Sequence, residues 1–393
     1  IERPRLLQSG LKLGCWTGCE PPPADQIWLL TPEQLLEIHH SGQLRPEDHL
    51  VIPEAEWLPS RLRRAMTVQI DTCHWEQLRA AFPSAGEGLL DLHERLSRQL
   101  VALGGGANRD LVMPESALTM VRDLLQLLGS TPEPWCQLMS MEQSSWASWA
   151  RMDPLTLQWC WQLQPLEPVI ALESVFSSHP WTLIHADGGC RRHGEARSAD
   201  DDELRIDLRD APRGDPLPIY LPRRQPLPNT EIFADHLLEQ SRRLILGRSG
   251  LTAVLVNPLR MRQRLCSELA AEFGSRVTLE STAPETNGVI CCSWSWWLSH
   301  QHLLPEPEQL IAAMLPIASR EDPLTAARVE SLKRQGRDWF RTLLLPEALA
   351  ILIPAIASLR LSGGRLAILD GRVRGRSWGE HVLRALEPWE ALQ

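Results

Sequence analysis

The feature that most constrains the fold is a regular alternation of short apolar runs and amphipathic stretches through the second half of the chain. The runs have the length of buried strands, and the stretches between them have the three- and four-residue apolar spacing of helices. Such alternation predicts an α/β domain with a doubly wound parallel sheet. The expected strands are Leu251–Val256, Val277–Glu280, Gly288–Ser293, Ile311–Leu315 and Arg365–Asp370, and the expected helices are Thr230–Leu246, Met261–Phe273, Thr325–Leu344 and Glu347–Leu359.

The first half of the chain predicts a smaller unit of the same kind, interrupted by a long insertion. From Met66 to Gln164 the apolar spacing is helical and predicts no strand. After the insertion, Gly188–Gly214 is rich in Asp, Arg and Gly, which indicates a surface loop or a domain boundary. The other expected elements are the strand Asp25–Thr31, the helix Pro32–His40, the strand Asp48–Ile52 and the strand Trp181–His185.

The length of 393 residues exceeds the usual size of one hydrophobic core, so two domains, or one domain with a large insertion, are expected. The nine cysteines are odd in number and scattered, which indicates free thiols in a reducing cytosol. The longest apolar runs are broken before they reach the roughly 20 residues of a membrane span, and the start has no signal-peptide pattern. We therefore expect a cytoplasmic protein without a membrane segment. The first residue is Ile1 rather than Met, which suggests a fragment.

Several segments of the second half follow one another in a distinctive order and spacing: Gly250–Leu265, then Leu315–Ala318, Glu321–Leu324 and Leu345–Ala348, and finally Ala367–Arg372. In this order they resemble motif IV, the segment after motif V and the last core strand of a known family, the DinG/XPD-type superfamily 2 DNA helicases. The resemblance implies two RecA-like domains, the first incomplete and carrying a helical insertion. Residues 1–65 and 166–205 would form domain 1, residues 66–165 the insertion, and residues 206–393 the helicase C-terminal domain 2.

The family binds ATP and Mg²⁺ through a Walker A loop, G-x-x-x-x-G-K-[ST], whose lysine reaches the phosphates. This chain has only two lysines, and neither fits: Lys12 is followed by Leu13 and Lys333 by Arg334. The run 104–106 is three glycines, but no lysine follows it. We therefore expect no ATP cofactor in this chain, with the alternative that the loop lies upstream of Ile1.

The Walker B box of the family, Asp-Glu-Ala-His after an apolar strand, corresponds here to 53–56. Its Mg²⁺-holding Asp has become Pro53, while Glu54 keeps the position of the acid that orients the attacking water, and Glu56 ends the box. Glu54 is thus a candidate catalytic remnant, expected to be inactive, or an acidic turn retained for packing. Motif III corresponds to 184–188, where Asp187 follows His185 at a strand end and turn.

Motif VI of the family supplies arginines to the transferring phosphate. The best local alignment puts Ser358 and Leu361 at those positions, and a shifted alignment would instead bring in Arg360. Motif V, which normally ends in an acidic and glycine-containing box, corresponds to Ser293–Leu298 and lacks both residue types. The phosphoryl-transfer groups that the resemblance implies are therefore mostly missing.

The sequence predicts no metal site. Family members with an iron–sulfur cluster hold it with four cysteines between Walker A and Walker B, but only Cys15 and Cys19 precede Glu54 here. Two thiolates cannot supply four ligands, so a cluster is not expected. The pairs Cys190–His193 and Cys73–His74 lack the second half that makes a zinc site specific.

Nucleic-acid binding is better preserved than catalysis. The protein has a net charge of −9, yet the stretch Glu330–Arg376 is rich in arginine, and cations with aromatic faces are what hold single strands. The candidates are Arg360, Arg365, Arg372, Arg374, Arg376, Trp294 and Trp296. The alternative for the tryptophans is core packing. Arg223-Arg224 and the arginines at 260, 262 and 264 equally fit solvated faces.

Three functions remain open on this reading. The first is a DinG-like pseudo-helicase that binds nucleic acid, with single-stranded DNA as the expected partner, and lacks ATPase activity. The second is a fragment of an active ATP-dependent DNA helicase whose P-loop lies upstream. The third is a scaffold that binds a protein partner. The full reading frame separates the first two.

Overall fold

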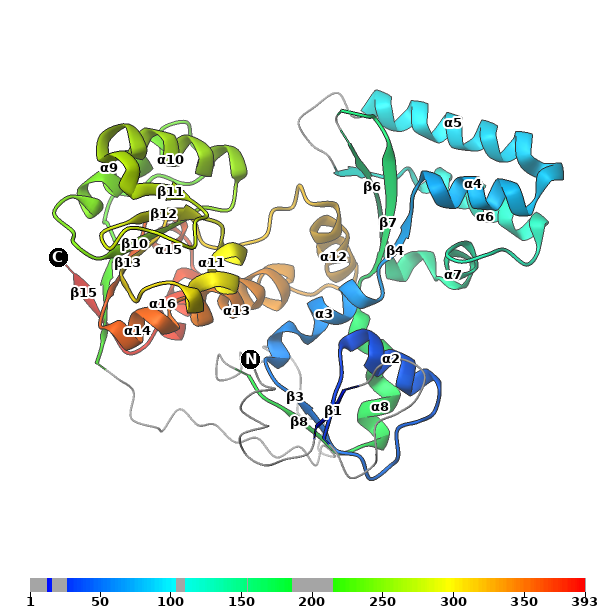
Figure 1. Cartoon of the computed structure of the whole chain (residues 1–393), viewed down its shortest axis with the longest axis horizontal. Coiled ribbons are helices and arrows are strands. Elements are labelled where there is room, and N and C mark those ends of the chain that lie inside the picture. The colour runs from blue at the N-terminus through cyan, green and yellow to red at the C-terminus, as the bar shows by residue number, and fades with distance from the viewer. Residues whose placement is uncertain (1–12, 16–26, 104–109, 154, 186–214, 393) are drawn as a thin grey trace. The chain divides into compact units, whose positions relative to one another are not determined.

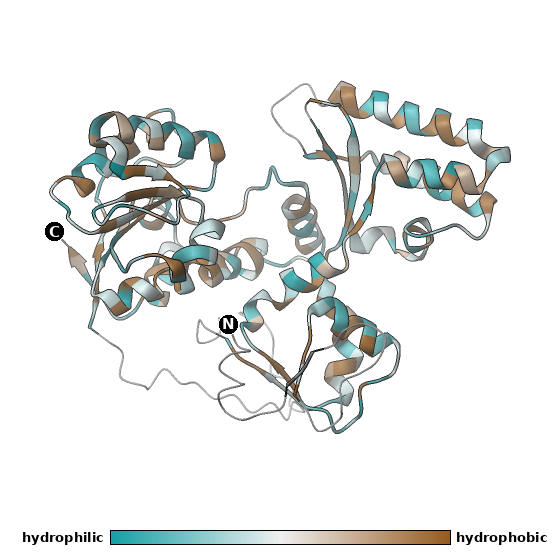
Figure 2. Ribbon diagram, in the orientation of Figure 1, coloured by the Kyte–Doolittle hydropathy of each residue, from teal (hydrophilic) through white to brown (hydrophobic). Residues whose placement is uncertain are grey.

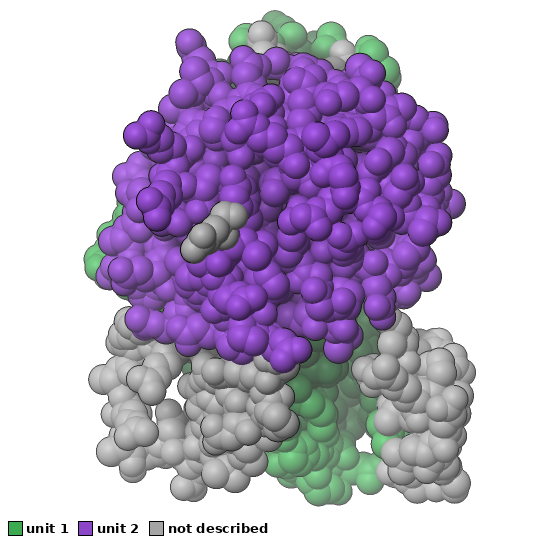
Figure 3. All heavy atoms as spheres, turned by 90° about the vertical axis from the view of Figure 1, so that its left-hand side faces the viewer, with its two compact units in different colours: residues 1–184, 319–337 green, residues 185–318, 338–393 purple. Residues whose placement is uncertain are grey.

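The computed structural model describes residues 13–15, 27–103, 110–153, 155–185 and 215–392. The chain divides into two compact units, which Figure 3 shows in separate colours: residues 1–184 with 319–337 form unit 1, and residues 185–318 with 338–393 form unit 2. Residues 319–337, expected in the second domain, thus group with the first. The expected boundary at 205/206 lies outside the described residues.

Unit 2 contains a seven-stranded sheet in the order β11-β12-β10-β13-β14-β9-β15, and every pairing in it is parallel. Its central strands are buried on both faces, which is why they are continuous apolar runs in the sequence and appear brown in Figure 2. The predicted doubly wound sheet is confirmed. The strands are β9 Leu217–Tyr220, β10 Leu251–Leu255, β11 Val277–Leu279, β12 Val289–Cys292, β13 Pro307–Ala312, β14 Arg365–Ile368 and β15 Trp389–Leu392.

Helices cover both faces of this sheet (Figure 1). Apolar side chains of α9 and α10 pack in one core cluster, whereas those of α11, α13, α14 and α16 pack in another on the opposite face. The helices are α9 Phe233–Ile245, α10 Leu259–Phe273, α11 Trp294–His300, α13 Leu345–Ala355, α14 Ala357–Ser362, α15 Arg372–Gly375 and α16 Gly379–Ala385, with short turns η6 Gly274–Arg276 and η7 Gln301–Leu303 and the π-turn η8 Phe340–Leu344.

The helical stretch Phe340–Ser362 is long and apolar enough to cross a membrane by length and composition, which the sequence analysis did not expect. In the fold it is a core element: Leu345, Leu349 and Leu352 are buried against the sheet. Pro346 lies in the first turn of α13, where a backbone N–H has no acceptor within the helix, so the proline is tolerated there. We interpret the stretch as a core helix rather than a membrane span.

Unit 1 begins with two small parallel sheets, β1-β2 and β3-β8. Thr31 and Gln34 form a capping box that starts α2 at the residue predicted. Apolar residues of α2, α3 and α8 close a small core on these strands. The elements are β1 Leu13–Cys15, β2 Ile27–Leu29, α2 Pro32–His40, β3 Leu50–Ile52, η1 Ala55–Trp57, α3 Leu58–Ala65, η4 Pro168–Leu172, α8 Glu173–Ser178 and β8 Trp181–Leu183.

The insertion is not purely helical, which corrects the prediction. It contains a four-stranded antiparallel sheet in the order β4-β7-β6-β5. The strands β6 and β7 alternate tryptophan with small and polar residues, so they lack the apolar run that marks a fully buried strand. The elements are β4 Val68–Ile70, α4 Thr72–Ala81, η2 Pro83–Ala85, α5 Gly86–Leu103, β5 Asp110–Val112, α6 Glu115–Leu128, α7 Trp135–Ser140, η3 Gln143–Ser145, β6 Trp146–Met152 and β7 Trp159–Pro165.

The two faces of this antiparallel sheet are covered by different parts of the chain. Helices α4 to α7 cover one face. On the other face, Leu324 and Ala327 of helix α12 (Pro323–Arg334) pack against Trp149. The helix expected over Thr325–Leu344 is therefore broken: α12 ends at Arg334, and Gly336, two residues further on, has a φ of 69°, which favours glycine.

Candidate functional site

The Walker B and motif III remnants lie side by side in unit 1. Strands β3 and β8 pair in parallel with Ile52 opposite Leu183, so their carboxyl ends meet at one edge. Beyond this edge the amide of Ala55 donates to the carbonyl of Ile184 over 2.9 Å. The fold thus brings together two segments that are far apart in sequence, as the resemblance implies. Asp187 lies outside the described residues.

Glu54 is held by an arginine rather than by groups suited to a metal. Its side chain is 60% exposed and forms an ion pair with Arg61, seven residues along on α3. Its backbone is left-handed, with φ of 51°, a conformation that costs free energy and recurs at functional turns. Pro53 supplies no carboxylate to this turn, and no group of three metal-binding side chains occurs among the described residues. The arrangement can hold a guanidinium; nothing in it resembles a Mg²⁺ site.

The remnants of motifs IV and V meet at the carboxyl edge of the seven-stranded sheet. Strands β10 and β12 are parallel neighbours, so Asn257 and Ser293, which follow them, lie close together. The Asn257 carbonyl oxygen Oδ1 accepts from the amide of Trp294 over 3.3 Å. Glu280, which follows β11 with φ of 48°, accepts from the amide and hydroxyl of Ser293 over 3.0 and 2.8 Å. This network caps helix α11.

Arg262 belongs to the same network, and its solvated-face interpretation is wrong. The residue is only 8% exposed, and Nη1 donates to the carbonyls of Val256 and Asn257 over 2.9 Å each. Its Nη2 lies 3.4 Å from the Glu280 carboxylate. Sequence reasoning missed this role because the partners come from two segments, one after β10 and one after β11. The available signal was the position of Arg262 in the first turn of α10, the helix that follows β10.

Trp294 cannot be a stacking residue for nucleic acid, which corrects the prediction. It is 1% exposed, and its indole N–H donates to the carbonyl of Met314 over 3.0 Å. Trp296 is half-buried and stacks on His300, with ring centroids 4.5 Å apart and planes 14° from parallel. The bases of a single strand would find an aromatic edge at Trp296 but none at Trp294.

Three of the five candidate arginines are half-buried and engaged in the fold, and a fourth, Arg374, is exposed but donates to the carbonyl of Leu221 over 2.9 Å. Arg365 donates to Gln309 and to the carbonyl of Leu244, and burial lowers its pKa. Arg372 forms an ion pair with the buried carboxylate of Asp370 over 2.7 Å. Arg360 donates to backbone carbonyls near the end of the chain. These three fix loops and strand ends rather than present a free cation, whereas Arg374 and Arg376 are exposed.

The positions aligned with motif VI present no cation. The hydroxyl of Ser358 donates to Gln301 over 3.1 Å. Leu361 is 85% exposed and apolar. Arg360, the residue that a shifted alignment would bring in, is held by the carbonyls of Leu386 and Pro388. The geometry therefore does not support an arginine finger at this segment.

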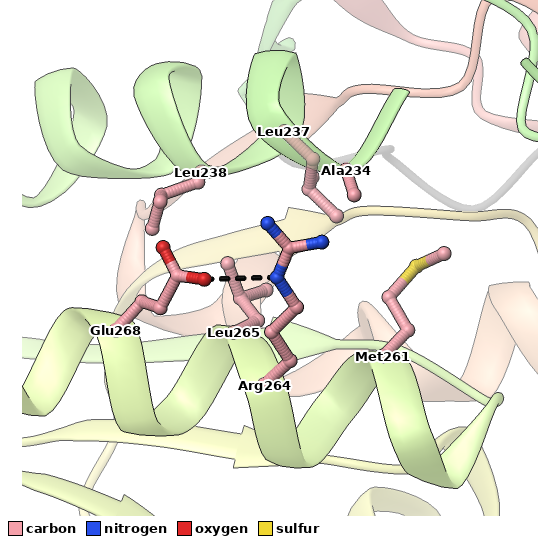
Figure 4. A pocket seen from close by; sticks show the side chains of 7 residues that line it. All are labelled: Ala234, Leu237, Leu238, Met261, Arg264, Leu265 and Glu268. Atoms are coloured by element: carbon pink, nitrogen blue, oxygen red, sulfur yellow. Dashed lines mark hydrogen bonds and ion pairs between the residues drawn. The ribbon is translucent and has the colours of Figure 1, made fainter. Parts of the chain in front are cut away.

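The hollows of the described surface are modest. A crevice between α9 and α10, drawn in Figure 4, leaves about 10 Å³, the room of a single water, under the Arg264–Glu268 ion pair. A wider hollow of about 380 Å³ opens at the tip of the β6–β7 hairpin. It is lined by Asp71, Thr72, Cys73, Arg151, Met152, Asp153, Gln158, Trp159 and Cys160. Of its charged lining residues, Arg151 is ion-paired with Asp110 and Asp71 with His74.

Each of the two units has a parallel sheet with motif remnants at its carboxyl edge, an arrangement consistent with RecA-like domains. The chain is 28% identical over 135 residues to the ATP-dependent DNA helicase YoaA of Haemophilus influenzae, a match that covers 34% of this chain and 21% of that protein. It is similar in fold to Xpd4 of S. tokodaii, with a TM-score of 0.62 and 14% identity, over 100% of this chain and 87% of the other. No family model matches.

Both likenesses point the same way as the motif remnants: the chain is similar to DinG/XPD-type superfamily 2 helicases. The matched segment spans about a fifth of the length of YoaA. The predicted fold class and family resemblance are confirmed by these likenesses. The domain boundaries, the site residues, the cofactors and the cytoplasmic location stay predictions.

Proposed function

We propose that this chain is a DinG-like, helicase-related protein of the cytoplasm that binds nucleic acid and does not hydrolyse ATP by itself. The observation that carries the loss of activity is the ion pair between Glu54 and Arg61 beside Pro53. The carboxylate that would orient the attacking water accepts from a guanidinium, and the adjacent residue supplies no Mg²⁺ ligand.

The motif VI segment supports the same proposal independently. Its arginine positions hold Ser358, bonded to Gln301, and the exposed Leu361. Loss of an arginine finger alone costs about 10³–10⁵ in rate. With neither a P-loop lysine nor these arginines in the chain, the proposal is that no Mg²⁺·ATP is bound tightly and none is turned over.

DNA-stimulated ATP hydrolysis by the purified chain tests this proposal. We expect the phosphate release of the wild type to equal that of Glu54→Gln, with and without single-stranded DNA. Arg61→Ala is a second control, since it frees the Glu54 carboxylate and should still give no turnover. Hydrolysis by the wild type above the Glu54→Gln background would overturn the proposal.

A second candidate function is a fragment of an active ATP-dependent DNA helicase. It is favoured by the YoaA match, since the matched protein is an ATP-dependent DNA helicase and the match spans only 21% of its length. The reading frame upstream of Ile1 decides between the two: a G-x-x-x-x-G-K-[ST] there, together with ATPase activity of the longer protein, would establish the enzyme.

The nucleic-acid part of the proposal rests on exposed arginines of unit 2. A protein of net charge −9 repels a polyanion at long range, so we expect modest affinity that falls as salt rises. Fluorescence anisotropy with a labelled single-stranded oligonucleotide over a salt series measures both. A chain that does not bind at low salt would instead support the scaffold interpretation, in which a protein is the partner.

A further inference from the structure

Two loops at the carboxyl edge of the seven-stranded sheet are hydrogen-bonded to each other. They follow β9 and β14, which are parallel neighbours. The guanidinium of Arg374 donates to the carbonyl of Leu221 over 2.9 Å, and the side-chain amide of Gln225 donates to the carbonyl of Leu369 over 2.6 Å. Residues 221–226 and 369–376 therefore form one surface, although they are far apart in sequence.

Gly371 shows how closely the two loops approach. A β-carbon at this position would lie 2.4 Å from the carbonyl oxygen of Gln225 and 2.6 Å from that of Pro226. Both neighbours are backbone atoms, which cannot turn aside as a flexible side chain could. The close contact fixes the two loops against each other, so that the side chains they carry are held in a defined arrangement.

The joined loops carry four exposed arginines, which we call the arginine surface: Arg223, Arg224, Arg374 and Arg376. Within the described part of the chain, no carboxylate forms an ion pair with any of them. Two other exposed arginines of unit 2 differ: Arg243 pairs with Glu239, and Arg264 pairs with both Glu268 and Asp235, whereas the isolated Arg260 and Arg384 form no ion pair among the described residues.

The acidic groups near the arginine surface do not neutralise it. Asp370 is buried and already paired with Arg372. Glu231 and Glu380 are the next carboxylates along the chain after the two loops, and neither is ion-paired with the arginine surface in the described residues. The surface is thus a local concentration of positive charge on an acidic protein.

The topology of the sheet also favours a ligand at this place. The element after β9 is α9, whose Phe233 packs on one face, whereas α15 and α16 after β14 place Val373 and Val382 on the other. Neighbouring strands whose connections leave to opposite faces make a topological switch point. In open α/β sheets, ligands bind outside the carboxyl ends of the strands at such points.

We infer that the arginine surface binds the phosphate groups of a single-stranded nucleic acid. Guanidinium groups match phosphate geometry with two parallel donors, and several unpaired ones in a fixed array suit a chain of phosphates. Trp378, two residues after Arg376, is half-buried with its ring centroid 5.2 Å from that of Phe340, and it offers an aromatic edge for a base. The inference rests on the proposed nucleic-acid binding and locates it.

The test is anisotropy of a labelled oligothymidylate over a salt series with the full chain. Replacing all four arginines of the surface with Ala should weaken binding at low salt on the order of tenfold or more, and should make the log–log salt slope shallower by about 0.7 for each lost phosphate contact. The matched control is Arg243→Ala with Arg264→Ala, which removes exposed arginines that are already ion-paired and should leave the slope unchanged.

Two further arms keep the outcome clear. The quadruple variant loses the hydrogen bond from Arg374 to Leu221, and a lower Tm would show that this loss has unfolded the loops. The triple variant Arg223→Ala, Arg224→Ala and Arg376→Ala keeps this bond. We expect it to weaken oligonucleotide binding without lowering the Tm. Competition with inorganic pyrophosphate at equal ionic strength distinguishes a nucleic-acid backbone from free phosphate as the ligand. We expect pyrophosphate not to displace the oligonucleotide. Displacement at micromolar pyrophosphate would overturn the inference and indicate a site for free phosphates.

The failures of the two proposals are distinguishable. If the wild type binds the oligonucleotide and the triple and quadruple variants bind with the same affinity and salt slope, the arginine surface is not the site, and the proposed function stands. If the wild type does not bind at low salt, the proposed function fails, and the inference fails with it.

Discussion

The carboxyl edge of the β3–β8 sheet and that of the seven-stranded sheet occupy equivalent places in their units, but their charges are arranged differently. At the first edge, Glu54 is exposed and paired with Arg61. At the second, the acids Glu280 and Asp370 are engaged in the fold, and arginines are left exposed. The comparison teaches that equivalent edges of two α/β sheets can expose different charges, an acid paired with an arginine at one edge and, among the described residues, arginines without a carboxylate partner at the other.

The first prediction concerns the free energy of unfolding that is lost when one carboxylate is removed from each edge, beginning with the seven-stranded sheet. Asp370 is buried, accepts from the amide of Leu315 over 2.9 Å and pairs with Arg372. Asp370→Ala would leave that guanidinium without its partner, so we expect a loss of about 3–5 kcal/mol in the free energy of unfolding. Urea unfolding of the full chain, monitored by tryptophan fluorescence, measures this loss of stability.

Glu54→Ala is the matched change at the other edge. Its ion pair is solvent-exposed, and such pairs contribute about 0–1 kcal/mol. We expect an unfolding free energy within about 1 kcal/mol of the wild type. Equal losses for Asp370→Ala and Glu54→Ala would contradict the distinction between the two edges.

An effect smaller than that of Asp370→Ala is expected from Gly371→Ala. The added methyl group would meet the carbonyl oxygens of Gln225 and Pro226, so the loops must separate at a cost of about 1–3 kcal/mol. Oligonucleotide affinity should fall with stability, because the arginine surface depends on both loops. Gly375→Ala, where no atom lies within 4 Å of the added group, is the control. Unchanged Tm and affinity for Gly371→Ala would show that the loops are not fixed.

The smallest expected effect is a change in the pKa of one thiol, that of Cys266. Cys266 on α10 accepts a hydrogen bond from Cys291 on β12, which lowers the pKa of Cys266 to about 7. Burial and the same bond raise the pKa of Cys291. Alkylation requires the thiolate, so the iodoacetamide rate of Cys266 should rise with pH and level off above about pH 7.

Cys291→Ala tests the cause of this shift. Without the donor, the pKa of Cys266 should return towards the ordinary thiol value near 8.5, and the midpoint of the alkylation profile should move up with it. Peptide mapping assigns the label to Cys266. A profile that does not move in Cys291→Ala would show that the thiol contact does not set the reactivity.

The alternating elements of unit 2 could be predicted because their cause is local. Strand β10 is buried at all five residues, and a strand buried on both faces must be a continuous apolar run. The insertion could not be predicted in the same way. Strands β6 and β7 carry Trp149 and Trp161 on alternate faces, one against α12 and one against α4 to α7, and the polar residues between them conceal the pattern.

The candidate site was predictable in its motifs but not in its accessibility. The order of the motif remnants placed Glu54, Ser293 and Arg372 at strand ends, where the structure has them. Whether a side chain is free depends on partners far along the chain. Arg365 is engaged by the carbonyl of Leu244, and Trp294 by that of Met314. Conversely, Arg223 and Arg224 become candidate binding residues only because the fold brings Arg374 next to their loop.

Helix α12 has a consequence for how the protein is made. It covers Ala147 and Trp149 of the insertion sheet, yet it is synthesised only after strands β9 to β13 of the other unit. A nascent chain that has completed β6 and β7 therefore displays an apolar sheet face until residue 334 emerges, and such faces invite aggregation. Unit 1 expressed by itself should need residues 319–337 supplied through a linker, because any chain that stops before α12 lacks the cover for that face.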